Sequence, residues 1–588
     1  MTERNHAHDD DGDAGRSPDS VRSRTGRYLV APTGWVTAAD AAADPMAREQ
    51  KLIEALRRNP DLRVLRVVRS SVSEAVAGEG HAGSAGLRYP TVAVVETTPE
   101  QATVLAARPE FHVDIDQPLK QRESLPPWPA TEASSFDELT QVRFQTRDEE
   151  GEPVQDAFLY VHGGACPVTG RTDAEGFAEL TVPAGTLDDV EGVYVRPRAD
   201  HWSVVIDRPA LSHTEINTVV CRRLGEVSEE HPGDHWARQV MGFDHIPPTY
   251  RGHGVKIAVV GSGVAAGRLA SEQVTGGIDV VGQDDKSWDQ DLTGRATHHV
   301  ALIVGHDGDG LVGVAPEAEV HVCRALPGGR LSNLIEVLDY CITQEVDIID
   351  LGVYAEQPSV LVAQKLEEVR QAGILCVAAA GDTSGPVRFP GTLPALLTVA
   401  AIGRMGTFPP DSAHAAQIAG IPTPEGLFAA RSSCRGPEVD AWLPGVAVIS
   451  AAATGGRVAL DGSAVAATYG AALAGLVLAH HPDFRYGFVS RGPARVQRLA
   501  QLVRASCRPL AGLPGAGVPD ARVAVGLAPP FGSPGEPWAS DPLQVPQYAM
   551  PADRLRTGYA EPSSGEQAAM LSAALRAAEF LVPELDDY

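Results

Sequence analysis

The sequence has few basic residues for its length, and none of its continuous apolar runs is expected to span a membrane. Its 588 residues carry 49 Lys and Arg against 76 Asp and Glu, which gives a formal net charge of −27. That charge disfavours the counterion release on which nucleic-acid affinity depends, and it repels anionic membrane surfaces. The apolar run GAALAGLVLA is far shorter than the ~20 residues of a membrane span. We therefore expect neither a nucleic-acid partner nor a membrane partner.

We also expect neither a disulfide framework nor a signal peptide. The seven cysteines are scattered, odd in number and without a CxxC pair, a pattern that predicts reduced thiols and no structural zinc. The opening stretch MTERNHAHDDDGDAGRSPDSVRSRTG has no apolar core and does not look like a signal peptide. We expect a cytoplasmic protein that needs no metal and no cofactor. Residues 1–25 are predicted to be a disordered polar tail.

Residues 26–120 predict a compact α+β unit. RYLVA, LRVLRVVR, TVAVVET and FHVDID have the apolar patterns of strands, and AREQKLIEALRRNP and TPEQATVLAARPE those of helices. The order is β-α-β-β-α-β, which is ferredoxin-like. Thr98-Pro99-Glu100 is typical of a helix start, with proline at the first helical position.

The next two segments predict a linker and a small β-sandwich. Residues 121–137, which contain ESLPPWPATEASS, are expected to be the linker. Residues 138–225 show short strands split by EEGEP, TDAEG and PAGT at intervals of about ten residues, a spacing typical of an antiparallel sandwich.

Residues 232–512 predict an α/β domain. The continuous apolar runs VKIAVVGSGV, VDIIDLGV, ILCVAAAG and LLTVAAIG alternate with helical segments, as in a doubly wound, mostly parallel sheet. Residues 513–560 are Pro- and Gly-rich and are expected to be extended. Residues 561–588 contain EQAAMLSAALRAAEFLV, an apolar-faced helix that packs on its own chain or on a partner.

Several segments of the α/β domain resemble, in order, the subtilisin-like serine protease family (peptidase S8). GVKIAVVGSGV resembles the strand that ends at the family's catalytic Asp, and GRATHHVALIVG resembles the helix start with its catalytic His. ILCVAAAGD resembles the strand that ends in Ala-Gly-Asn. DGSAVAATYGAALAG resembles the Gly-Thr-Ser-Met-Ala nucleophile loop. Residues 27–118 resemble the family's propeptide (inhibitor I9), and residues 138–223 resemble a carboxypeptidase-regulatory-type sandwich.

The resemblance implies a catalytic triad whose positions hold other residues. Gly261 stands at the Asp position, Arg295 at the His position, Ala464 at the Ser position and Asp382 at the oxyanion Asn position. A glycine cannot orient an imidazole, and an arginine stays protonated and cannot act as a base. A methyl group cannot attack a carbonyl, and an ionised carboxylate repels an oxyanion. We therefore expect a pseudoprotease without peptidase activity.

Two alternatives to these assignments remain open in the sequence. If the valine after the paired histidines is aligned with the family's valine, Ala296 rather than Arg295 takes the His position. A rearranged active site that uses Ser463 and His298 would make the chain an active serine endopeptidase, although Ser463 is expected to cap the following helix. Cys434 is a weaker nucleophile candidate, because nothing near it in sequence would lower its pKa.

The expected function is that of an adaptor or regulator that binds a protein or an extended peptide. The resemblance places Gly352, Val353 and Tyr354 on the edge strand that hydrogen-bonds substrate backbone, and such strand addition needs no nucleophile. The bulky Tyr354, where the family has glycine, argues against peptide binding. Permanent occupation of the cleft by the I9-like unit is the second possibility, and a purely structural assembly protein is the third.

Overall fold

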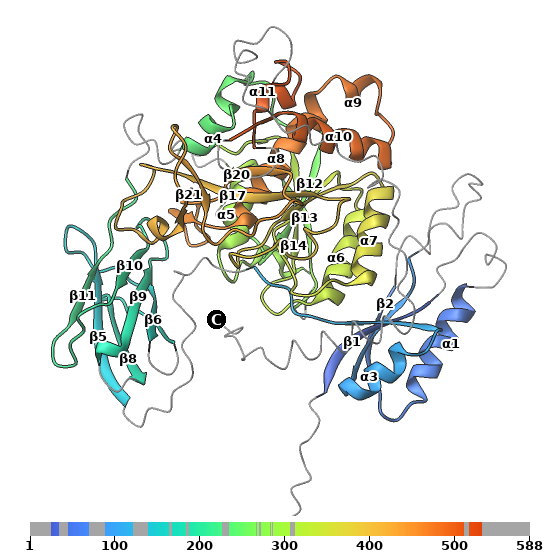
Figure 1. Ribbon diagram of the computed structural model, residues 1–588, viewed down its shortest axis with the longest axis horizontal. Helices are drawn as coiled ribbons and strands as arrows, with labels where there is room; N and C mark the ends of the chain where they lie inside the picture. The colour runs from blue at the N-terminus through green and yellow to red at the C-terminus, as the bar shows by residue number, and fades with distance from the viewer. Residues whose placement is uncertain are drawn as a thin grey trace, which may run out of the picture.

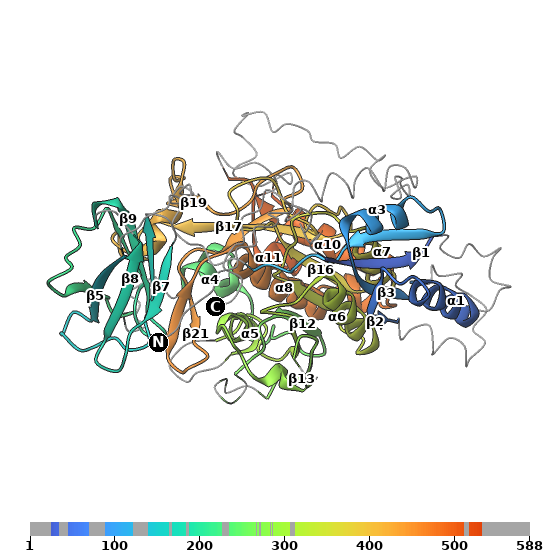
Figure 2. The same ribbon diagram turned by 90° about the horizontal axis from the view of Figure 1, so that it is seen from below.

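The computed structural model shows a central α/β body with a smaller β-rich unit on either side (Figures 1 and 2). The β-sandwich lies at one end in both views and the N-terminal α+β unit at the other. The structure describes residues 25–33, 45–69, 89–121, 139–225 without 164–166 and 184–186, and 235–531 without 266, 268, 270–271, 283, 285, 306–311 and 511–516. The predicted tail 1–25 and the predicted helix in 561–588 therefore lie almost wholly outside the described residues.

The N-terminal unit is a four-stranded antiparallel sheet with two helices on one face. Its elements are β1 (Gly26–Pro32), α1 (Pro45–Arg57), β2 (Arg63–Val68), β3 (Val92–Thr97), α3 (Pro99–Ala106) and β4 (Phe111–Ile115), and the sheet order is β2-β3-β1-β4. Thr98 caps α3, where its hydroxyl accepts the Gln101 N–H, and Pro99 opens the helix. Alternate residues of β1 face opposite ways. Tyr28 and Val30 pack on the unit's own helices, whereas Leu29 and Ala31 join the core beneath the helices of the α/β body.

The sandwich consists of two sheets that enclose a small apolar core. One sheet has the order β10-β9-β6-β7 and the other β11-β5-β8. The strands are β5 (Leu139–Arg147), β6 (Phe158–Gly163), β7 (Val168–Arg171), β8 (Phe177–Pro183), β9 (Val190–Arg196), β10 (Val204–Asp207) and β11 (Asn217–Val220). The prediction of a wholly antiparallel sandwich is wrong at β11, which pairs with β5 in parallel. After β10 the chain crosses to the other sheet instead of forming a hairpin, so β11 runs in the direction of β5.

The α/β body is built on a nine-stranded, mostly parallel sheet. The order is β13-β14-β12-β15-β16-β17-β19-β18, with β20 parallel to β17, and only the β17–β19 and β19–β18 pairs are antiparallel. Helices α6 and α7 share one apolar core with the sheet, and α5 and α8 share the other. The strands are β12 (Lys256–Gly261), β13 (Val274–Asp279), β14 (Glu319–Arg324), β15 (Ile348–Leu351), β16 (Leu375–Ala379), β17 (Leu397–Arg404), β18 (Ile418–Ala419), β19 (Leu427–Ala430), β20 (Ala441–Pro444), β21 (Val448–Ala451) and β22 (Arg457–Leu460). The helices are α4 (Trp236–Val240), α5 (Arg295–Val304), α6 (Leu331–Thr343), α7 (Val360–Gln371), α8 (Ser463–His480), α9 (Asp483–Tyr486) and α10 (Pro493–Ala505).

Helix α8 is the central buried helix, and its small residues allow close contact with the sheet. A Cβ added at Gly470 would lie 3.0 Å from a Val377 methyl, and one at Gly475 would lie 3.1 Å from Ile257. Among the described helices, α8 alone is long and apolar enough to cross a membrane, and 83% of it is buried within the protein. Its apolar sequence is therefore accounted for by its position in the core.

The predicted end of the α/β domain at residue 512 is wrong. After the undescribed residues 511–516 the chain returns to the core through β24 (Val518–Pro519), which pairs with β23 (Cys507–Arg508), and through α11 (Ala521–Ala524). The Trp442 N–H donates to the Gly517 carbonyl, and the Ala521 N–H to the Met241 carbonyl. A Pro- and Gly-rich composition suggested extended chain here, but the short segment 518–525 contributes four fully buried apolar residues to the core, namely Val518, Ala521, Ala524 and Val525.

Candidate functional site

The positions singled out in the sequence meet at the carboxyl ends of the central parallel strands. Gly261 ends β12, Gly352 follows β15, Asp382 follows β16 by three residues, and Arg295 and Ala464 lie in the first turns of α5 and α8. This edge of a doubly wound sheet is where ligands ordinarily bind, because loops from several strands converge there.

Gly261 is held against the start of α5. A Cβ added at Gly261 would lie 2.9 Å from the Cβ of Ala296, closer than side chains normally approach. The neighbouring Arg295 is buried, and its guanidinium donates to the Asp461 carbonyl over 3.4 Å. An aspartate at position 261 would therefore collide with Ala296, which of the two candidate His positions is the one that contacts Gly261.

Asp382 and Ser463 form a buried pair. The Ser463 N–H donates to one carboxylate oxygen over 2.8 Å and its hydroxyl to the other over 3.0 Å, while the Gly381 N–H donates to the Ser463 hydroxyl over 3.1 Å. Burial raises the pKa of Asp382 to about 6, although the Ser463 hydrogen bonds and the charge of Arg295 act in the opposite direction. Ser463 is the first residue of α8 and not its cap, so the predicted capping role is wrong, and Gly462 holds the cap position.

Ala464 and Gln121 both lie beside Gly352. A Cβ added at Gly352 would lie 3.1 Å from the Cβ of Ala464 and 3.1 Å from the side-chain amide of Gln121. The side chain next to Gly352 on α8 is thus a methyl group.

Residues 117–121 lie as a strand between two segments of the α/β body. Lys120 exchanges both backbone hydrogen bonds with Tyr354, each 2.8 Å long. On the other side, the Leu119 N–H donates to the Gly329 carbonyl over 2.8 Å, and the Leu331 N–H donates to the Gln117 carbonyl over 2.9 Å. The edge strand at 352–354 is therefore paired with the protein's own chain, and the bulky side chain of Tyr354, buried at 1% exposure, does not prevent this pairing.

Two carboxylates of the N-terminal unit anchor this strand at helix starts. Asp116 accepts the N–H and hydroxyl of Ser332 in the first turn of α6, over 2.8 and 2.9 Å. Asp114 accepts the hydroxyl of Ser359 and the N–H of Leu361 at the start of α7, over 2.7 and 3.0 Å. Negative charge at a helix N-terminus is favourable because the first N–H groups lack partners within the helix.

The alternative nucleophile–base pair has different partners in the structure. His298 is fully buried, and its Nε2 bonds the Val448 carbonyl at 2.8 Å. Burial lowers the pKa of His298 to about 4. Ser463 instead bonds Asp382, and the buried Cys434 thiol contacts the Thr383 hydroxyl at 3.2 Å. None of these contacts couples a hydroxyl or thiol to a histidine.

Sequence reasoning missed one carboxylate beneath the site. Asp350 on β15 accepts the Thr468 hydroxyl of α8 over 2.6 Å, and its other oxygen has no partner among the described residues. Burial raises the pKa of Asp350 to about 7. The signal was present in the sequence, because VDIIDLGVY has Asp350 where the Ser-Leu-Gly strand of the resembled family has serine.

The sandwich contacts the hairpin that leads into α8. The Asp200 N–H donates to the Arg457 carbonyl, and the Arg457 N–H donates to the Asp200 carboxylate. The indole of Trp202 packs edge-on against His414, whose Nδ1 bonds Asp461 at 2.7 Å. The sandwich is thus connected to the segment immediately before Ser463.

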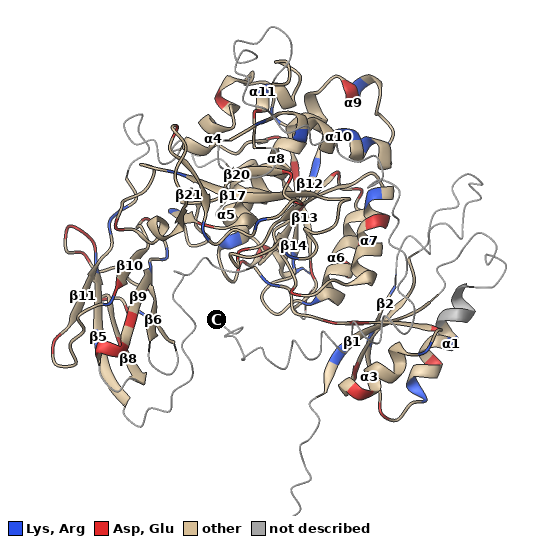
Figure 3. Cartoon of the chain, in the orientation of Figure 1, with Lys and Arg blue, Asp and Glu red and all other residues tan. Residues whose placement is uncertain are grey.

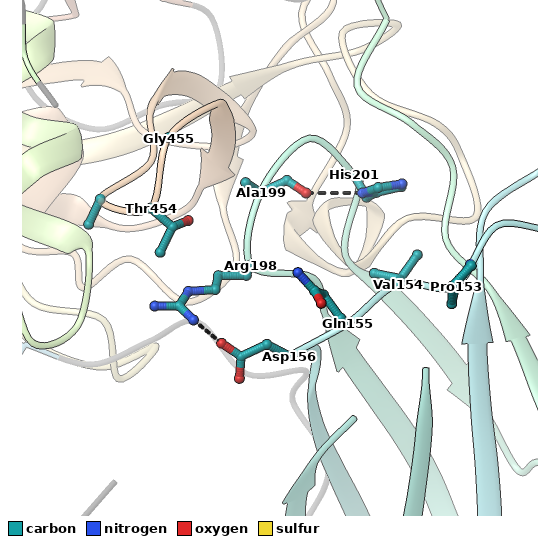
Figure 4. A pocket seen from close by; sticks show the side chains of 10 residues that line it. Pro153, Val154, Gln155, Asp156, Arg198, Ala199, His201, Thr454 and Gly455 are labelled. Carbon is teal, nitrogen blue, oxygen red and sulfur yellow. Dashed lines mark hydrogen bonds and ion pairs between the residues drawn. The ribbon is translucent and has the colours of Figure 1, made fainter. Parts of the chain in front are cut away.

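A cavity of about 580 Å³ lies along this contact, between sandwich loops and the β21–β22 turn (Figure 4). Asp156 and Arg198 form an ion pair at its wall, His201 bonds the Ala199 carbonyl at 3.0 Å, and Thr454 lines the opposite side. Within the described residues, no cluster of three or more His, Cys, Asp or Glu side chains is arranged to hold a metal ion.

Comparison with known proteins finds similarity to subtilases. A sequence model of the Subtilase family (Peptidase S8) matches residues 252–499. Subtilisin E of Bacillus subtilis (strain 168) is 25% identical over 274 residues, which cover 44% of this chain and 66% of that protein. The minor extracellular protease Epr of the same strain is 32% identical over 157 residues, 26% of this chain and 24% of that protein. A crystal structure of a cold adapted subtilisin-like serine proteinase is 20% identical and covers 49% of this chain and 98% of that one, with a TM-score of 0.38.

The fold and the sequence matches together define the class of the central body. It is a mixed α/β domain with a largely parallel sheet, and residues 252–499 belong to the subtilase (peptidase S8) family. The match spans slightly less than two thirds of the length of the first subtilisins compared.

Proposed function

We propose that this chain is a subtilase-related pseudoprotease whose cleft is closed by its own residues 117–121, and that it acts as a protein-binding adaptor or regulator. One observation carries the proposal: Ala464, which has no nucleophilic atom, lies beside Gly352, where the strand 117–121 also ends. The surrounding groups support it. Arg295 cannot act as a base, and Asp382 offers only acceptors when ionised.

The lost nucleophile has a consequence for the N-terminal unit. Without a nucleophile the protein does not cleave its own chain after residue 121, so the unit stays covalently attached to the α/β body. Asp114 and Asp116 at the helix starts, together with the Arg66–Glu336 ion pair at 2.7 Å, then hold it in place. A partner peptide that used the edge strand at 352–354 would have to displace residues 117–121.

Fluorophosphonate labelling of the purified full-length protein tests the absence of activity. We expect no mass adduct in a sample that melts cooperatively, with a subtilisin as the positive control. An adduct that disappears in the Ser463→Ala variant would overturn the proposal, because it would identify a peptidase with a rearranged site.

Peptide binding tests the closed cleft. The probe is a synthetic peptide of residues 113–124 of this chain, and the variant is Lys120→Pro, which removes the N–H that donates to Tyr354. We expect no binding to the wild-type protein or to Lys120→Ala, which keeps that N–H, and measurable binding to Lys120→Pro. Equal binding to all three proteins would mean that residues 117–121 do not occupy the cleft in solution.

A further inference from the structure

Three large apolar side chains are exposed where the described chain ends. Tyr486 at the end of α9 is 86% exposed, Val489 in the following loop is 61% exposed, and Leu527 after α11 is 47% exposed. We call these three residues the α9 surface. The helices that carry it lie together at one end of the α/β body (Figure 1).

The α9 surface rests on a packed base and is not a loose loop tip. A Cβ added at Gly526 would lie 3.1 Å from the ring of His481, so the segment bearing Leu527 lies directly against the α8–α9 junction. The rings of His481 and Phe484 are 6.3 Å apart, and those of Phe484 and Phe488 are 6.5 Å apart. Helix α9 is therefore attached to the α/β body through the buried ring of Phe484.

Two arginines flank this surface in an otherwise acidic protein, and the acidic Asp483 on α9 is paired with Arg498. Arg485 and Arg491 are both exposed on either side of Tyr486 and Val489. Figure 3 shows basic residues on α9 and α10 and an acidic residue on α9. Arg491 is held by Asp347 at 3.0 Å, which fixes its guanidinium close to the surface. An apolar patch with basic neighbours is suited to an apolar segment that carries acidic residues.

The chain itself supplies such a segment beyond the described residues. Residues 566–588 contain five acidic residues and one arginine, and a helix over 566–582 would place several apolar side chains on one face. Those side chains are Met570, Leu571, Ala574, Leu575, Ala578 and Leu581. The described chain ends at residue 531, four residues after Leu527. We propose that residues 566–588 dock on the α9 surface of the same molecule, apolar face inward and acidic residues towards Arg485 and Arg491.

The tether favours this occupant over a separate molecule. A segment joined to its site by a few tens of residues meets it at an effective concentration of about 1 mM, so even a weak contact is populated. The Arg–carboxylate contacts are solvent-exposed and should weaken with salt, whereas the apolar contact should not.

Engineered disulfide formation in the full-length chain tests the proposal. The six described native cysteines are buried, so a Cys166→Ser background leaves only introduced thiols reactive. Val489→Cys combined with Leu575→Cys should form an intramolecular disulfide at least about tenfold faster than Ile421→Cys combined with Leu575→Cys. Ile421 is a stringent control, because at 95% exposure it is the more accessible site.

The outcomes are distinct. Equal rates for the two pairs would overturn the proposal, and so would a disulfide between two chains, which would make a second copy the occupant. Hydrogen exchange gives a second measurement that needs no thiols. Protection of residues 566–582 should fall in a Tyr486→Ser/Val489→Ser variant and not in Ile421→Ser, and equal protection in both would also overturn the proposal.

Discussion

Asp350 beneath the candidate site makes the stability of the α/β body depend on pH in a predictable way. Burial raises its pKa to about 7 from an ordinary value of 3.8. Because the folded-state pKa is the higher one, the neutral carboxyl favours the folded state. That contribution is fully present below about pH 4 and is lost as the pH rises through about 7. A shift of about 3 units at 1.36 kcal/mol per unit corresponds to about 4 kcal/mol of stability lost over this range.

The perturbation is Asp350→Asn, which keeps the shape and the acceptor for the Thr468 hydroxyl but cannot ionise. The amide NH₂ of the variant would take the place of the carboxylate oxygen that has no partner. We expect this to lower the free energy of unfolding by about 1–3 kcal/mol at every pH. That cost lowers the free energy of unfolding equally at all pH values and does not change how it depends on pH. We therefore expect the free energy of unfolding of the variant, relative to the wild type, to increase by about 4 kcal/mol between pH 4 and pH 8.

Urea unfolding at several pH values, followed by tryptophan fluorescence, measures this difference. Trp442 and Trp236 are buried in the α/β core and report its transition. Asp188→Asn is the matched control, because Asp188 is exposed on the sandwich and its substitution should leave the pH dependence unchanged. If the Asp350→Asn and wild-type curves stay parallel from pH 4 to pH 8, the reasoning about the buried carboxyl is wrong.

Three further predictions concern the cleft and its neighbours. Ala464→Ser should remain unreactive towards fluorophosphonate, because neither Arg295 nor Ala296, the two candidates for the His position, can accept its proton. Intact mass would reveal an adduct. Asp116→Ala should weaken docking of the N-terminal unit by about 1–3 kcal/mol, because the hydrogen bonds to Ser332 are lost. Hydrogen exchange at the start of α6 should then be faster, and unchanged exchange would contradict the anchoring role. Trp202→Ala should lower the free energy of unfolding by about 3–5 kcal/mol, because Trp202 packs on His414 between the sandwich and the α/β body, and an unchanged urea midpoint would contradict that packing.

The sequence predicted the parallel sheet and its central helix, because the patterns that indicate them lie within short stretches of the chain. Apolar runs such as VKIAVVGSGV have the pattern of buried parallel strands, and small residues along 463–480 indicate a helix that packs closely on them. The helix start at Thr98-Pro99 could likewise be predicted from the sequence, because its capping hydrogen bond involves only neighbouring residues. The parallel pairing of β11 with β5 could not be predicted from the sequence. It joins strands about seventy residues apart and depends on where the chain crosses from one sheet to the other.

The sequence by itself determined which side chains stand at the candidate site. Positions 261, 295, 464 and 382 hold glycine, arginine, alanine and aspartate, and none of these is the serine or the histidine of a peptidase site. Only the tertiary structure decided what those residues do instead: Asp382 bonds Ser463, Ala296 fills the space beside Gly261, and residues 117–121 pair with Tyr354. Each of these contacts joins segments far apart in the chain. Side-chain identity limits the possible chemistry, but packing in space selects the partners.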